Sequence, residues 1–192
     1  MNQNISRRSL LRAGAGTLAA GLLAACTTTK KGTTTTITLN VAEVVDYGNA
    51  ILSFASTAIN VSFVASAMGT ANLALANTVI ASLKSALTAF QSAAGSSTSV
   101  SYNSASVKTA FDSIITDVEK VDTLIIAVIT GTAANLSSSM VSDAKTAAGA
   151  AETLIDLLKA MVDVSGPRLR SVSPADPDAA IGKIAIFAAS QG

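Results

Sequence analysis

The chain has 192 residues, of which 13 are Lys or Arg and 12 are Asp or Glu, with one Cys and no His or Trp. Without imidazoles and spare thiols, zinc, copper, haem and iron–sulfur centres are excluded, as are hydrolases that use a His general base. No cofactor and no disulfide is expected. An enzyme that works only with carboxylates and Tyr47 or Tyr102 is a distant alternative.

The first 25 residues have the layout of a removable export signal, a basic start followed by a short apolar stretch. The apolar stretch, residues 13–25, is too short to span a bilayer, which takes about 20 residues. Around Arg7 and Arg8, the run SRRSLLR resembles the twin-arginine signal of bacterial exported proteins. That resemblance implies export of a folded protein.

The export signal ends in Leu23, Ala24, Ala25 and Cys26, which resemble the lipobox of bacterial lipoproteins. The resemblance implies a diacylglyceryl group on the Cys26 thiol, cleavage before this residue, and acylation of the new amino terminus. Because Thr27 rather than Asp follows, it also implies the periplasmic face of the outer membrane. Several acyl chains would hold the protein stably, since each buried CH₂ contributes about 0.8 kcal/mol. An amphipathic N-terminal helix with a buried Cys26 is the alternative.

Cleavage would leave residues 26–192, a length that suits one domain with its own core. It would remove three basic residues and no acidic one, so that ten basic residues face twelve acidic ones and the net charge falls near −2. Such a charge gives no attraction to nucleic acid, which is therefore not expected as a partner.

Residues 26–39 are rich in Thr and carry no helical pattern. We expect them to form a flexible tether with a root-mean-square span of about 20 Å. The alternative is a β-strand over residues 33–39, since Thr and Ile favour strands.

Residues 40–165 predict an all-α domain, an up-down four-helix bundle. Asn40 and Glu43 resemble a capping box at the first helix start, and Gly69, Gly131 and Gly166 are placed to end helices. Ser104 is expected to cap the third helix. Apolar residues at helical spacing predict the buried seams of the second, third and fourth helices: Leu73, Ala76, Ile80, Leu83, Leu87 and Phe90; Val107, Phe111, Ile114, Val118, Val121, Ile125 and Val128; Met140, Ala144, Ala147, Ala151, Leu154, Leu158 and Met161.

Charged residues of the third and fourth helices lie off these seams, and we expect them to form solvated pairs. The expected pairs are Lys108 with Asp112, Asp117 with Lys120, and Lys159 with Asp163. The uncharged residues 50–68 approach the length of a membrane span. Their hydroxyl and amide groups favour a buried bundle helix instead, because these groups are costly in lipid.

Residues 166–192 predict a Pro-containing loop and a short apolar helix that starts at Asp176 and Pro177. Packing across the bundle is the expected role, and an exposed docking segment is the alternative.

Candidate catalytic and metal sites are weak. Ser142 and Lys145 match S-x-x-K, but the companion motifs of penicillin-interacting enzymes are absent. Asp117, Glu119 and Asp122 could suggest a cation site, yet their spacing spreads them around a helix. We therefore expect no catalytic residue and no metal site.

We expect a non-enzymatic envelope lipoprotein that is held in the membrane through Cys26 and binds another protein or supports an assembly. A carrier or sensor of an apolar small molecule between the helices is the alternative. Self-association through the first helix stays open.

Overall fold

The computed structural model describes residues 26–31, 34–133, 138–163 and 176–191. The predicted export-signal residues, Arg7, Arg8, Leu23, Ala24 and Ala25, lie outside the described residues, whereas the backbone of Cys26 begins the first strand.

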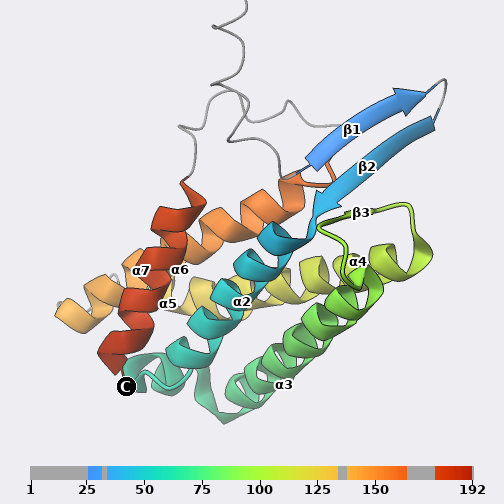
Figure 1. The fold of residues 1–192 in the computed structure, drawn as a ribbon. Helices are drawn as coiled ribbons and strands as arrows, with labels where there is room; N and C mark the ends of the chain where they lie inside the picture. Colours follow the sequence, from blue (N-terminus) through green and yellow to red (C-terminus); the bar gives the residue numbers. More distant parts are fainter. Residues whose placement is uncertain (1–25, 32–33, 134–137, 164–175, 192) are drawn as a thin grey trace, which may run out of the picture.

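Helices make up most of the described chain and confirm the all-α expectation at that level (Figure 1). They are α2 (Val41–Ala58), α3 (Ser62–Ala94), α4 (Ala105–Val121), the π-helix η1 (Asp122–Ile126), α5 (Ala127–Ala133), α6 (Ser139–Ala160) and α7 (Pro177–Gln191). A small antiparallel sheet adds β1 (Cys26–Lys31), β2 (Thr34–Asn40) and β3 (Ser99–Ser101), in the order β1-β2-β3.

Helix α2 lies at the centre of the helical body, where it packs against α3, α6 and α7 (Figure 1). Its Phe54 ring meets Phe187 of α7 with 6.2 Å between centroids, and both side chains are fully buried. A second aromatic pair, Phe90 of α3 and Phe111 of α4, also has centroids 6.2 Å apart. These two pairs place large apolar side chains at separate helix contacts in a core otherwise rich in Ala, Ile and Val.

The expected tether is wrong, because residues 26–31 and 34–40 pair as a hairpin that places Cys26 opposite Leu39. Ile37 and Leu39 are buried, as alternation along a strand with one face on a core predicts. The alternative, a strand over residues 33–39, is therefore confirmed from Thr34 to Leu39. Its partner β3 lies in a Ser-rich loop whose sequence carries little strand signal.

The predicted start of α2 is confirmed, but its predicted end at Gly69 is wrong. The Asn40 side chain accepts hydrogen bonds from the backbone N–H groups of Ala42 and Glu43 and donates one to Glu43. The helix ends at Ala58. The side-chain amide of Asn60 donates to the Ser56 carbonyl and so satisfies one acceptor of the last turn. Gly69 instead interrupts α3 with a φ of 69°. Residues 50–68 are thus divided between α2 and α3.

The seams predicted for the later helices are largely confirmed, with shifts where the helix geometry changes. The π-turn of η1 inserts an extra residue into the ladder, so that Ile126 and Ile129 are buried in addition to Ile125, and Val128 is only partly buried. In α6, Met140 is 41% exposed, while the rest of its predicted seam is buried.

Helix α7 packs across α2 and α6, which confirms the expected role and not the exposed alternative. The Asp176 carboxylate accepts bonds from the N–H groups of Asp178 and Ala179, as an N-cap does. Ile184 and Phe187 are buried, and Ile186 is 72% exposed.

Gly48 marks a close approach of α2 and α3. A Cβ atom at this position would lie 2.3 Å from Cδ2 of Leu87, which is itself buried. Nothing lies within 4 Å of the equivalent position at Gly149, on the exposed side of α6.

We therefore predict that Gly48→Val lowers the free energy of unfolding by about 1–3 kcal/mol, since Leu87 has to move within a packed core. Gly149→Val, the matched control, should change it by less than about 0.5 kcal/mol, because Val and Gly differ little in an exposed helix. Urea denaturation measures both values. Equal effects of the two substitutions would contradict the close packing at Gly48.

Candidate functional site

The exposed side of α3 is the most unusual surface of the described chain. Among the described residues, α3 is the one helix long and apolar enough to cross a membrane by length and composition. Only 33% of its most apolar stretch is buried, although a core helix of that composition would be mostly covered. The exposed residues of α3 are mainly Ala, Ser, Thr and Asn, and Leu75 is its one exposed large apolar side chain.

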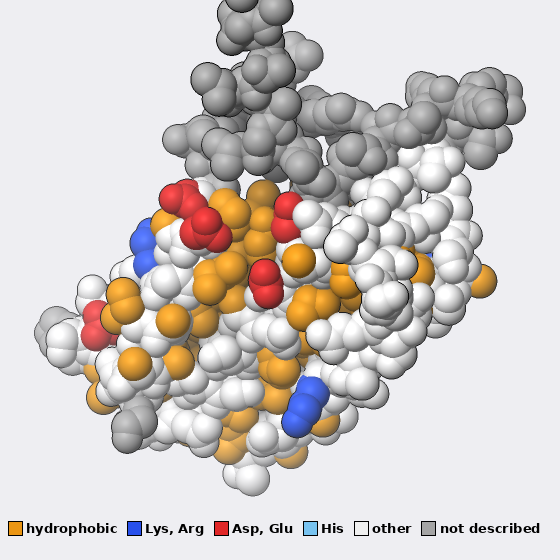
Figure 2. All heavy atoms as spheres, viewed as in Figure 1, with side chains coloured by type: hydrophobic (Ala, Val, Ile, Leu, Met, Phe, Trp, Pro, Cys, Tyr) orange, Lys and Arg blue, Asp and Glu red, His pale blue; other side chains and the backbone are white. Residues whose placement is uncertain are grey.

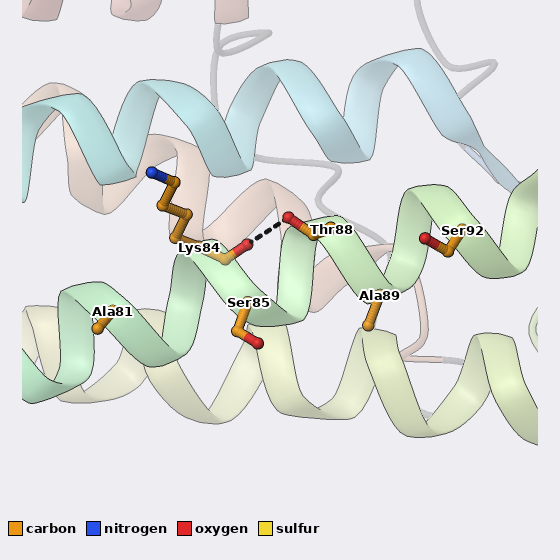
Figure 3. A pocket seen from close by; sticks show the side chains of 6 residues that line it. All are labelled: Ala81, Lys84, Ser85, Thr88, Ala89 and Ser92. Atoms are coloured by element: carbon orange, nitrogen blue, oxygen red, sulfur yellow. Dashed lines mark hydrogen bonds between the residues drawn. The ribbon is translucent and has the colours of Figure 1, made fainter.

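Two hollows open to solvent along this side of α3. The first, of about 470 Å³, is lined by Ala81, Lys84, Ser85, Thr88, Ala89 and Ser92 (Figure 3). The second, of about 620 Å³, lies between α3 and α4 and is lined by Ser82, Ser85, Ala86, Ala89, Ala93, Ala105, Ser106, Thr109, Ala110 and Ser113. We call this second hollow the α3/α4 groove. In Figure 3, Ser85 and Ala89 point toward α4, and Lys84 points away from it.

Several hydroxyl groups along the two hollows are used within their own helices. Thr88 donates to the Lys84 carbonyl, Thr109 to the Ala105 carbonyl, and Ser113 to the Thr109 carbonyl, at 2.9–3.0 Å. A bound group would therefore meet mainly methyl groups and occupied hydroxyls. Such walls suit close packing of small apolar side chains more than recognition of a polar ligand.

Asp117 was expected at the surface, and this prediction is wrong because its residue is only 2% exposed. Its carboxylate accepts a bond from Ser82 Oγ at 2.5 Å and one from Lys120 Nζ at 3.1 Å. Ser82 belongs to the wall of the groove, so the bond ties α3 to α4 directly beneath it. Sequence spacing correctly paired Asp117 with Lys120, but no signal in the sequence showed the hydroxyl from α3.

Tyr102, Lys108 and Asp112 form a polar cluster at the start of α4. Tyr102 Oη donates to Asp112 at 2.6 Å, and Lys108 Nζ bonds both Tyr102 Oη and the Asp112 carboxylate. Burial alone would raise the pKa of Asp112, but the bonds from Lys108 and Tyr102 lower it. Burial and the bond to Asp112 raise the pKa of Tyr102. The Lys108 and Asp112 side chains are about half exposed, which confirms this predicted surface pair.

A second titratable cluster surrounds Tyr47 where α7 covers α2. Burial raises the pKa of Tyr47 to about 12, and the nearby carboxylates of Glu43, Asp178 and Asp46 add to the shift. Burial also raises the pKa of Glu43, whose Oε2 atom is buried without a hydrogen-bond partner. Tyr47 therefore stays protonated at neutral pH and is a poor general base.

The residues weighed as cation and catalytic candidates lie as follows. In the described residues, no group of three or more Asp, Glu or Cys side chains is placed to hold a metal ion. Of the weighed cation candidates, Asp117 bonds Ser82 and Lys120, and Glu119 pairs with Lys159 of α6 at 3.1 Å. Lys159, the residue expected to pair with Asp163, thus has Glu119 as a partner. The S-x-x-K residues Ser142 and Lys145 are both exposed on α6.

Comparison with known proteins identifies no relative: the chain matches no protein-family model, no curated protein and no solved structure.

We predict that Ser82→Ala lowers the free energy of unfolding by about 1–2 kcal/mol, since the buried carboxylate of Asp117 loses one of its two bonds. Ser85→Ala, on the same exposed face, should change it by less than about 0.5 kcal/mol. Thermal or urea denaturation checks both. Indistinguishable stabilities of the two variants would show that the bond between Ser82 and Asp117 contributes nothing.

Proposed function

We propose that this protein is an exported lipoprotein, held by lipid on Cys26 at the periplasmic face of the outer membrane, whose helical body binds another envelope protein without catalysing a reaction. The resemblance of the first residues to a twin-arginine signal, with Leu23 to Ala25 before Cys26 as a lipobox, supports the anchoring. The body in this proposal is the up-down four-helix bundle expected from the sequence, with α7 laid across it.

The observation that carries the binding role is the uncovered side of α3, formed by small residues, together with the α3/α4 groove. A helix that docks between two others needs small side chains on both walls, because they let the backbones approach closely. Alanine, serine and threonine supply all the lining residues of the groove. An amphipathic helix with small or apolar side chains is the partner chemistry that fits.

The charge beside the two hollows indicates which charge the partner helix should carry. Lys84 is the one charged residue among those that line the two hollows. It is exposed and points away from α4 (Figure 3). A carboxylate on the flank of the docking helix would complement it, whereas a basic helix would be disfavoured.

The carrier alternative draws support from volume alone. About 620 Å³ lies within the range of small-molecule sites. Such sites enclose most of their ligand, however, and this groove is open to solvent along its length. A protein partner therefore remains the better-supported proposal.

The anchoring is tested with a Cys26→Ala precursor compared with the wild type. We expect the wild type to take up labelled fatty acid and to fractionate with membranes, and the variant to do neither, because the thiol is the attachment point. Arg7→Lys/Arg8→Lys should retain the precursor in the cytosol. A wild-type chain that stays soluble and unacylated would contradict the anchoring.

The binding face is tested by placing a photoreactive residue at position 89, which lines both hollows, and at Glu152, which is exposed on α6. Irradiation in cells should give a discrete larger product from position 89 and none from position 152. The product should carry the mass of a different polypeptide with the crosslink in a helix. A product of twice the mass of this chain would identify a second copy instead, and no product would contradict the binding face.

A further inference from the structure

The hairpin brings the anchoring residue back to the body of the protein. Strand β1 runs outward from Cys26 to Lys31, and β2 returns from Thr34 to Asn40. Directly opposed residues of antiparallel strands have Cα atoms about 4.5–5.5 Å apart. Because Cys26 is opposed to Leu39, the backbone of the anchoring residue lies beside a fully buried core residue.

This placement differs from that of a flexible tether. A free chain over residues 26–39 would separate the lipid from the body by about 20 Å on average. In the hairpin the chain runs away from the body along β1 and back along β2. Cys26 therefore stays opposite Leu39, which directly precedes the N-cap of α2. The hairpin projects from the end of the body at which α2 begins (Figure 1).

We infer that the protein lies close to the lipid surface with the amino-terminal end of α2 toward it and the β1–β2 hairpin laid along the lipid, held there by the β1–β2 pairing. This inference rests on the proposed lipidation of Cys26. It fixes which end of the body faces the membrane and leaves the opposite end, at the turn between α2 and α3, facing away. With 18 residues at 1.5 Å each, α2 separates the two ends by about 27 Å.

The charge at this end indicates which lipid surface suits it. Glu43 and Asp46 lie in the first turns of α2, and Asp178 lies in the first turn of α7 beside them. Most of the acidic side chains on the face shown in Figure 2 lie toward the end that carries the hairpin. A surface of zwitterionic phosphatidylcholine would therefore be contacted more closely than an anionic one.

The experiment uses the acylated full-length protein purified from membranes. Lipidation consumes the chain's one thiol, so that a Cys introduced elsewhere is the sole site for a fluorophore. Ala42→Cys labels the exposed first turn of α2, and Ser62→Cys labels an exposed position just beyond the other end of α2. The protein is bound to phosphatidylcholine vesicles that carry a nitroxide quencher on the headgroup.

We expect several-fold stronger quenching at residue 42 than at residue 62. Equal quenching, or stronger quenching at residue 62, in a protein proved by mass to be acylated would overturn the inference and leave the proposed lipid anchor intact. A purified chain whose Cys26 takes up the fluorophore would instead show that the anchor is missing, and both proposals would fail.

A second pair of variants tests the hairpin itself. Tyr102 N donates to the Ile37 carbonyl, so the backbone N–H and C=O groups of Ile37 point toward β3. The backbone N–H groups of its neighbours Thr36 and Thr38 therefore point toward β1. Thr36→Pro/Thr38→Pro removes those amides, and Thr36→Val/Thr38→Val keeps them. The proline variant should lose most of the difference in quenching between residues 42 and 62, and the valine control should keep it. An unchanged difference in the proline variant would overturn the role given to the strand pairing.

Discussion

The junction at Asn40 is the constraint on which the rest of the structure depends. This residue ends β2 and caps α2, so that the sheet and the central helix share one fixed point. Its side chain bonds Ala42 and Glu43, and the next N–H group, that of Val41, donates to the Thr98 carbonyl beside β3. Since α2 packs against α3, α6 and α7, the orientation set at this junction is passed to the whole body.

Local signals in the sequence predicted the parts of the fold that local chemistry decides. Asn40 and Asp176 cap helices as expected, because each has a side-chain acceptor placed for the next N–H groups. Most of the apolar residues that helical spacing placed on the seams of the later helices are buried. The π-turn could not be predicted from that spacing, because a constant repeat fits the sequence as well as the shifted one that buries Ile129.

The failures occur where distant segments meet. By its sequence alone the Thr-rich stretch favours a tether, whereas β2 pairs with the neighbouring β1 and also with β3, which comes from a Ser-rich loop some sixty residues later in the chain. The sequence predicts a surface position for Asp117, whereas in the structure Ser82 of another helix donates a hydrogen bond to its carboxylate. The α3/α4 groove is of the same kind, since buried Ala76 and exposed Ala89 are the same residue type on one helix. Which alanines are covered depends on where α4 lies, and local periodicity does not encode that position.

The hairpin that holds the anchor close also bears on how the proposed lipoprotein would be processed. In that proposal, an enzyme that acylates Cys26 would need access to this residue, yet β1–β2 pairing places it beside Leu39. The sheet order resolves the conflict, because β1 is an edge strand with β2 as its one partner. Edge strands can open locally while the core stays folded. The described core begins with Ile37 and Leu39 in β2, which β3 continues to hold after β1 leaves. A body folded before export could thus present its lipidation residue without unfolding, and the strand would close against the body once the acyl chains had entered the membrane.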